Sequence, residues 1–317
     1  MNLYQLAEGA LTSLEHQDFA LEKEIQSIVE KNITTLFNIR AISSEFTVGE
    51  FRIDTLCFDD ETSSFVIVEY KRGNSYSVID QGYSYLSIML NNTAEFVLKY
   101  NETQSSPLKR DEIDWSSSRV IFISPSFNTY QKNSVNFRDV PFELWEIKKF
   151  AGGLISLDKH QSKSRASIDT ISGKKPTSII SQVSSEVSVA TEEQHVARLS
   201  EVGTEIYSTL RQALEQLPDT SFYATKSYVG CKKDNSVFCY IHFSENHLNV
   251  EITRGRISPS GEKSRGFFEL DDPKKIASPK TWTHKDGVTG HNYVIKITSV
   301  ADTDYAMYLI KQKYSIL

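Results

Sequence analysis

The chain has 317 residues and a formal net charge of −6, and 39% of its residues are hydrophobic. That length suggests about two domains, and so much apolar and aromatic sequence excludes a disordered or collagen-like chain. No stretch approaches about 18 consecutive apolar residues, so we expect no membrane-spanning helix. The negative charge excludes a uniformly basic surface, but it is compatible with a local basic patch.

Acidic residues interrupt the N-terminal segment, where a signal peptide needs an unbroken apolar region. The three cysteines, Cys57, Cys231 and Cys239, are spaced too widely for a disulfide framework or a zinc motif. The sequence therefore predicts a cytoplasmic protein.

The first part of the chain alternates helical and strand-like patterns. In chain order, we expect a helix at 19–37, strands at 50–58 and 64–71, a helix at 76–90, strand-like runs at 95–100 and 119–124, a helix at 129–136 and a strand at 141–150. Strands interleaved with helices predict an α/β domain built on one mixed sheet.

Residues 158–190 hold nine serines and no aromatic residue, which predicts a Ser-rich linker. We therefore divide the chain into a domain at 1–157 and a second domain at 191–317. The second domain opens with a helical pattern at 192–217 and continues with short strands, and a helix at 302–313 ends it. That order predicts an α+β domain.

Charged residues with potential chemistry lie in two adjacent strands near residues 51–73. If Phe58 pairs with Phe65 across the turn, the antiparallel register places Asp54 opposite Glu69, with Cβ atoms about 5 Å apart. Lys71 shares a strand face with Glu69 because side chains alternate with period two. The register thus predicts two carboxylates and an ammonium group at one place on the sheet.

Two carboxylates so close repel each other, and one of them would hold a proton unless a cation lay nearby. Asp54 and Glu69 offer the hard oxygen ligands that suit Mg²⁺ or Mn²⁺. Lys71 could orient or help deprotonate an attacking water, or stabilise charge on a pentavalent phosphorus. The alternative is a solvated charge pair at a strand end, which is the usual meaning of an isolated E-x-K.

Asp54 followed by Glu69-Tyr70-Lys71 resembles the PD-(D/E)XK (restriction-endonuclease-like) nuclease superfamily, and within it the NucS-related N-terminal domains. One departure is Ile53, where the motif has proline. The resemblance implies a restriction-endonuclease-like mixed sheet flanked by helices and a metal site for phosphodiester cleavage, with Asp54, Glu69 and Lys71 as catalytic residues.

The resemblance also implies an acidic metal ligand on the first helix. Glu22 is the first candidate, Glu24 competes with it, and Glu30 is a weaker candidate. Glu22 could equally be an exposed helix charge. Gln81 and Tyr85, four residues apart on one helical face, resemble a Q-x-x-x-Y element that lies near the nucleic-acid strand. A core tyrosine with a surface glutamine is the alternative.

Arg52 and Arg72 flank the two strands and could contact phosphates, although solvated strand-end charges explain them equally well. In the second domain, the segment 227–293 resembles an uncharacterised bacterial domain found fused to predicted nucleases. That resemblance implies a recognition or interaction role, through which a protein partner could bind. Basic and aromatic residues also gather there, and they suit either a nucleic-acid strand or a solvated face.

The expected function is a Mg²⁺-dependent (or Mn²⁺-dependent) nuclease that cuts DNA in bacterial antiviral defence or DNA repair. The alternative is a nucleic-acid-binding or partner-recruiting protein that retains the fold without turnover. The sequence leaves open RNA as a substrate, endonuclease or exonuclease action, the cleavage specificity and whether two chains form a homodimer.

Overall fold

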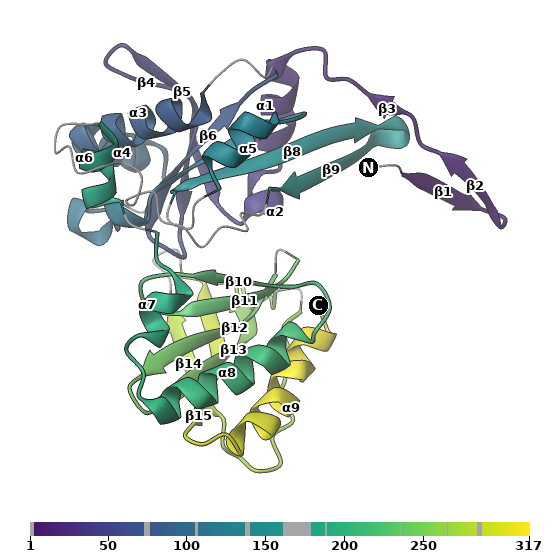
Figure 1. Cartoon of the computed structure of the whole chain (residues 1–317), viewed down its shortest axis with the longest axis vertical. Coiled ribbons are helices and arrows are strands. Elements are labelled where there is room, and N and C mark those ends of the chain that lie inside the picture. Colours follow the sequence, from purple (N-terminus) through teal and green to yellow (C-terminus); the bar gives the residue numbers. More distant parts are fainter. Residues whose placement is uncertain are drawn as a thin grey trace. The chain divides into compact units, whose positions relative to one another are not determined.

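The computed structural model describes residues 3–72, 77–104, 107–136, 140–160, 179–187, 189–234, 236–264, 266–283 and 287–317. The chain forms two compact units, Met1–Val189 and Ala190–Leu317 (Figure 1). No helix among these described residues is long and apolar enough to cross a membrane.

The first unit is built on a seven-stranded mixed sheet in the order β3-β8-β7-β6-β5-β4, with β9 paired to β8. Its strands are β3 (His16–Gln17), β4 (Arg40–Val48), β5 (Phe51–Asp59), β6 (Ser64–Tyr70), β7 (Arg119–Ser124), β8 (Phe142–Phe150) and β9 (Leu154–Lys159). The central pairs β6–β7 and β7–β8 are parallel, and the other pairs are antiparallel. A separate hairpin, β1 (Tyr4–Ala7) with β2 (Ala10–Ser13), precedes the sheet.

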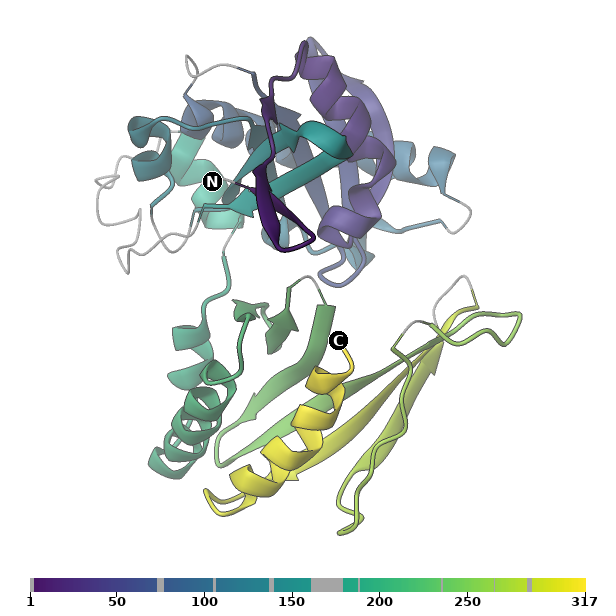
Figure 2. The ribbon, with the colours of Figure 1, turned by 90° about the vertical axis from the view of Figure 1, so that its right-hand side faces the viewer.

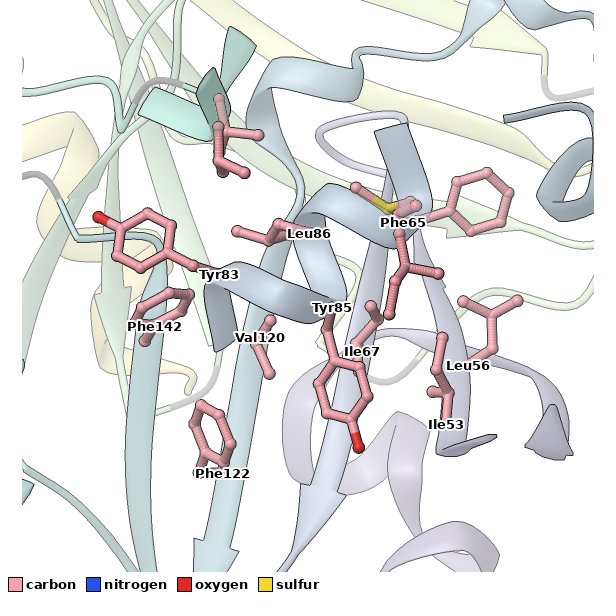
Figure 3. Packing of buried hydrophobic residues seen from close by; sticks show 14 of the residues in the cluster. Ile53, Leu56, Phe65, Ile67, Tyr83, Tyr85, Leu86, Val120, Phe122 and Phe142 are labelled. Atoms are coloured by element: carbon pink, nitrogen blue, oxygen red, sulfur yellow. The ribbon is translucent and has the colours of Figure 1, made fainter. Parts of the chain in front are cut away.

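Helices cover both faces of this sheet, which gives the expected α/β architecture. They are α1 (Glu22–Lys31), α2 (Ile33–Phe37), α3 (Val78–Asn91), α4 (Thr93–Thr103), α5 (Thr129–Ser134) and α6 (Ile179–Glu186), with 3₁₀ turns at Arg110–Glu112, Trp115–Ser117 and Ala151–Gly153. Along β6, Phe65 and Ile67 pack in the core with α3 and α4, whereas Val66 and Val68 pack with α1. Figure 3 shows the first core around α3.

Several sequence expectations differ from the structure. The strand-like run at 95–100 is part of helix α4, because Phe96 and Tyr100, four residues apart, are buried on one helical side. A short apolar run cannot by itself distinguish a strand from a buried helix. The expected helix at 19–37 divides at Asn32 into α1 and α2.

The expected linker at 158–190 also needs correction. Residues 158 and 159 belong to β9, and residues 179–186 form α6, which packs against α3. Val183 and Val187 are buried in the core of the first unit, so the spaced valines anchor this segment. Residues 161–178 and residue 188 of the expected linker lie outside the described residues.

The second unit is the expected α+β domain. Its six strands form an antiparallel sheet in the order β10-β11-β12-β13-β15-β14. The elements are α7 (Glu192–Val196), α8 (Glu201–Glu215), β10 (Thr220–Ala224), β11 (Val229–Lys233), β12 (Ser236–Ser244), β13 (His247–Ile257), β14 (Ser278–Thr283), β15 (Thr289–Ile297) and α9 (Asp302–Ser315). Helices α8 and α9 pack on one face of this sheet (Figure 2).

Candidate active site

The hairpin β5–β6 brings the two predicted carboxylates together. Phe58 pairs with Phe65, which confirms the expected register, and the ladder ends at the pair Thr55–Val68. Asp54 is the next residue, where its carboxylate Oδ2 accepts a hydrogen bond from the backbone N–H of Tyr70 at 3.1 Å. The side chain of Asp54 thus satisfies a donor at the end of β6, next to Glu69.

Glu69 is buried, with only 4% of its surface exposed, and both of its oxygens accept hydrogen bonds. Oε1 accepts from Lys71 Nζ at 2.7 Å and from Gln81 Nε2 at 2.8 Å. Oε2 accepts from the hydroxyl of Tyr85 at 2.9 Å. We call Asp54, Glu69, Lys71, Gln81 and Tyr85 the carboxylate cluster.

Helix α3 supplies Gln81 and Tyr85 from one side, since residues four apart lie on the same helical face. Gln81 Nε2 also lies 3.0 Å from the Tyr85 hydroxyl oxygen, so the two side chains contact each other as well as Glu69. The Tyr85 ring lies among Ile53 and Ile67, with its hydroxyl at the edge of the apolar core (Figure 3). Gly82 lies between them, and the Phe142 ring packs against it.

The electrostatics of the cluster disfavour a charged Asp54. Burial and the charge of Glu69, with a smaller contribution from Glu22, raise the pKa of the Asp54 carboxyl from 3.8 to about 7. The Tyr70 N–H and the Lys71 ammonium act in the opposite direction but do not restore the ordinary value. Asp54 therefore holds a proton over much of the acidic range unless a cation compensates the two carboxylates.

The acidic residues of α1 face different parts of the first unit. Glu22 is exposed, and its Oε2 accepts a hydrogen bond from the backbone N–H of Arg72 at 3.0 Å. Glu24 instead forms an ion pair with Lys149 of β8 at 2.8 Å. Of these two candidates, Glu22 is therefore the one at the end of β6, near Asp54.

The two arginines lie at the edge of the cluster. Arg52 is exposed and its side chain pairs with Glu45 of β4 at 3.0 Å. The carbonyl of Arg52 lies 3.5 Å from the Tyr85 hydroxyl. Arg72 is exposed and contributes its backbone N–H to Glu22.

A polar network behind Asp54 was not predicted from the sequence, although it includes Glu30, the weaker acidic candidate of the first helix. Gln26 of α1 donates to the Asp54 carbonyl at 3.1 Å and to Glu30 at 3.0 Å. Glu30 also accepts from the Thr55 hydroxyl, which lies 3.1 Å from the hydroxyl of Tyr70. The sequence signal that could have predicted this network is Gln26, a glutamine beside Ile25 within the apolar stripe of α1.

The donor set fits one hard cation that is held by few protein ligands. Among the described residues, no group of three or more His, Cys, Asp or Glu side chains is arranged to hold a metal ion. Mg²⁺, however, commonly uses one or two carboxylates and keeps several waters. Asp54 and Glu69 supply two such carboxylates, and burial together with the charge of Glu69 raises the pKa of Asp54.

Comparisons with known proteins give one extensive relative. No family model matches the chain. An uncharacterized protein of Haemophilus influenzae is 40% identical over 314 residues, which cover 98% of this chain and 99% of that protein. The match therefore extends over both units.

Two solved structures show a distant similarity. A structure of an EndoMS–dsDNA complex matches 46% of this chain and 64% of its own, with 16% identity and a TM-score of 0.27. A repair endonuclease from Pyrococcus abyssi matches 42% of this chain and 60% of its own, with 14% identity and a TM-score of 0.22. The match spans less than two thirds of either structure, and at these TM-scores it supports no functional assignment.

Proposed function

The chain belongs to the same family as the uncharacterized Haemophilus influenzae protein, and we propose that it is a metal-dependent nuclease that hydrolyses phosphodiester bonds in DNA. The observation that supports this proposal is the position of Asp54 beside Glu69 at the end of the β5–β6 hairpin, with Lys71 in contact. This arrangement matches the expectation drawn from the PD-(D/E)XK resemblance. It joins two hard ligands to one ammonium group.

Asp54 and Glu69 would hold Mg²⁺ or Mn²⁺, and Glu22 is close enough to their site to influence the pKa of Asp54. A bound divalent cation lowers the pKa of a coordinated water and neutralises charge on a phosphate oxygen. After burial, the charge of Glu69 is the main cause of the raised pKa of Asp54, and a divalent cation between the two carboxylates would offset their repulsion.

Lys71 has two tasks in this proposal. Its ammonium group donates to Glu69 at 2.7 Å and is itself largely buried, with 12% of the side chain exposed. A cation in such a place can stabilise negative charge that develops on phosphorus oxygens, or position a water for attack. Lys71 therefore changes from a partner of Glu69 to a partner of the reacting groups when substrate binds.

Gln81 and Tyr85 act as positioning residues. They fix the two oxygens of Glu69 through hydrogen bonds of 2.8 and 2.9 Å from a single helix. A carboxylate held on both oxygens keeps one rotamer, which is what a reproducible cation site needs. Arg52 and Arg72, exposed at the edge, are suited to contact phosphates of the bound strand.

The biological setting that we propose is bacterial defence or DNA repair, with the second unit selecting the substrate or a protein partner. The cleavage chemistry belongs to the carboxylate cluster alone. RNA cleavage is an outcome that the assay below distinguishes from DNA cleavage.

The test measures cleavage of four labelled substrates with Mg²⁺ or Mn²⁺: plasmid DNA, linear duplex DNA, single-stranded DNA and RNA. Wild type should cut at least one substrate, whereas Asp54→Asn and Lys71→Met should lose at least about 100-fold in rate. Lys149→Met is the matched control, because Lys149 also pairs with a glutamate at 2.8 Å but lies outside the cluster. Equal rates in wild type and Asp54→Asn would refute the proposal.

A second candidate is a nucleic-acid-binding protein that keeps the fold without turnover. The observation that favours it is the closed network around Glu69, whose two oxygens already accept three hydrogen bonds from side chains. Calorimetry separates the two candidates. Divalent binding that disappears in Glu69→Gln supports the enzyme, and nucleic-acid binding without any divalent binding supports the second candidate.

A further inference from the structure

The sheet of the second unit has one face that the described helices of this unit, α7, α8 and α9, do not cover. Helices α8 and α9 pack on the apolar side, through residues such as Ile241, Val250 and Ile295. Side chains that alternate with these point to the other side. One row of cross-strand neighbours crosses that side on all six strands: Tyr223, Gly230, Tyr240, Glu251, Val294 and Ser278. We call the surface around this row the helix-free face.

Aromatic rings lie on the helix-free face near strands β11 and β12 and at the opposite edge, on β14. Tyr228 contacts Tyr240 with ring centroids 4.9 Å apart and His242 at 5.4 Å. At the opposite edge, Trp282 of β14 lies over Gly290, where an added Cβ would be 2.2 Å from a ring carbon. The missing side chain of this glycine lets the indole lie directly against the strand backbone.

Basic residues surround these rings. Lys232 pairs with Val237, and Lys280 pairs with Asn292. Lys296 pairs with Asn249, and Arg256 pairs with Gly290. In an antiparallel ladder, paired residues face the same side of the sheet. Four basic side chains therefore share the helix-free face, although the chain as a whole carries a net charge of −6.

One carboxylate opposes them. Among the described residues of the six strands, Glu251 is the only acidic one, and it is 8% exposed. Its oxygens contact His242 at 3.3 Å, Lys280 at 2.5 Å and Asn292 at 2.9 Å. Burial alone would raise the pKa of Glu251, but these partners lower it to about 2. The carboxylate is therefore fully charged, and it fixes side chains from three neighbouring strands.

The helix-covered side lacks this excess of basic residues. Helix α8 carries Glu201, Glu205 and Glu215 with Arg211, and α9 balances Asp302 and Asp304 with Lys311 and Lys313. An anionic ligand is thus attracted more strongly to the helix-free face.

We propose that the helix-free face binds single-stranded nucleic acid. Bases stack on the aromatic group formed by Tyr228 and Tyr240, and the phosphates contact Lys296 and Arg256. Stacking side chains among basic residues recognise unpaired bases with little sequence preference. A duplex hides its base faces, and an acidic peptide has the charge but no planar rings. The inference goes beyond the proposed cleavage chemistry, because it assigns a substrate-holding surface to the second unit.

The experiment uses the full chain in EDTA, so that no cleavage occurs. Fluorescence anisotropy measures binding of a labelled oligothymidylate of about 16 nucleotides, a length suited to such surfaces. The variants are Tyr228→Leu, which keeps apolar bulk, and the double charge reversal Arg256→Glu with Lys296→Glu. Lys311→Glu on α9 is the control, since it reverses an exposed charge on the helix-covered side.

We expect wild type to bind, with affinity that falls as salt rises. The double reversal and Tyr228→Leu should each weaken binding about tenfold or more, and Lys311→Glu should not. Equal affinity in all proteins, equal weakening by Lys311→Glu, or poly-glutamate and duplex binding as tight as that of the oligonucleotide would each overturn the proposal. Because EDTA removes the divalent cation on which cleavage depends, this result stands apart from the fate of the cleavage proposal.

Discussion

The carboxylate of Asp54 accepts a hydrogen bond from the backbone N–H of Tyr70 at 3.1 Å, immediately beyond the last paired residues of the β5–β6 ladder. This bond holds Asp54 beside Glu69 although the two charges repel. The same contact favours the charged form of this half-buried carboxyl, but burial and the charge of Glu69 outweigh it and raise the pKa of Asp54 to about 7.

The stability of the metal-free protein should depend on the protonation of Asp54. The pKa of this group is about 7 in the folded state against an ordinary 3.8, so the folded state binds the proton more tightly. Its contribution is fully present below about pH 4 and is lost as the pH rises through about 7. The loss is at most about 4 kcal/mol.

Chemical denaturation in EDTA between pH 4 and pH 8 measures this effect. Asp54→Asn keeps an acceptor for the Tyr70 N–H but cannot ionise, so its free energy of unfolding should fall less with pH than that of wild type. Parallel pH dependence in the two proteins would show that Asp54 titrates normally.

The first helix offers a comparison of two glutamates. Glu22 lies near Asp54 and accepts from the Arg72 N–H, whereas Glu24 pairs with Lys149. We expect Glu22→Gln to weaken Mn²⁺ binding by about tenfold and Glu24→Gln to leave it unchanged. Thermal denaturation at increasing Mn²⁺ concentrations gives both affinities. The reverse order would identify Glu24 as the ligand.

Tyr85→Phe should alter the cation site without dismantling the fold. The substitution removes the hydroxyl that donates to Glu69 at 2.9 Å, and a buried bond to a charged group contributes about 2 kcal/mol. The Mn²⁺ concentration for half-maximal cleavage should rise several-fold, because Glu69 loses one of its constraints. Tyr130→Phe, on an exposed tyrosine of α5, is the control. An unchanged metal requirement would limit Tyr85 to a packing role.

Gly82→Ala should destabilise the first unit. A Cβ at this position would lie 2.6 Å from Cε1 of Phe142, so the ring must move. Such overpacking costs about 1–3 kcal/mol, which exceeds the gain of about 1 kcal/mol from alanine in a helix. Chemical denaturation measures the difference, with Ser84→Ala on the same helix as the control. A more stable Gly82→Ala protein would show that Phe142 moves at no cost.

Most of the candidate site could be predicted from the sequence, because side chains alternate between the two faces of a β-strand. Once Phe58 and Phe65 are paired, the positions of Asp54 and Glu69 follow from counting, and a spacing of four residues brings Gln81 and Tyr85 to one face of α3. The direct contact of both α3 residues with Glu69 could not be predicted, because it depends on how a helix packs on the sheet.

The remaining differences in the fold have similar causes. Strand β4 was missed because polar residues such as Ser43 and Ser44 interrupt its apolar pattern at a sheet edge with a register shift. The segment that contains α6 was expected to be linker because of its many serines, yet the first unit buries Val183 of α6 and Val187 directly after it. Local composition does not reveal that a core formed by distant residues has space in which such a segment can pack.

The most direct measurement of the central claim is calorimetric titration of Mn²⁺ into wild type and Asp54→Asn at pH 7. Wild type should bind the cation and release a proton from Asp54, so the heat should vary with the ionisation enthalpy of the buffer. Asp54→Asn should bind at least about tenfold more weakly and release no such proton. Absence of binding in wild type, or equal affinity and equal proton release in both proteins, would contradict a cation site at Asp54 and Glu69.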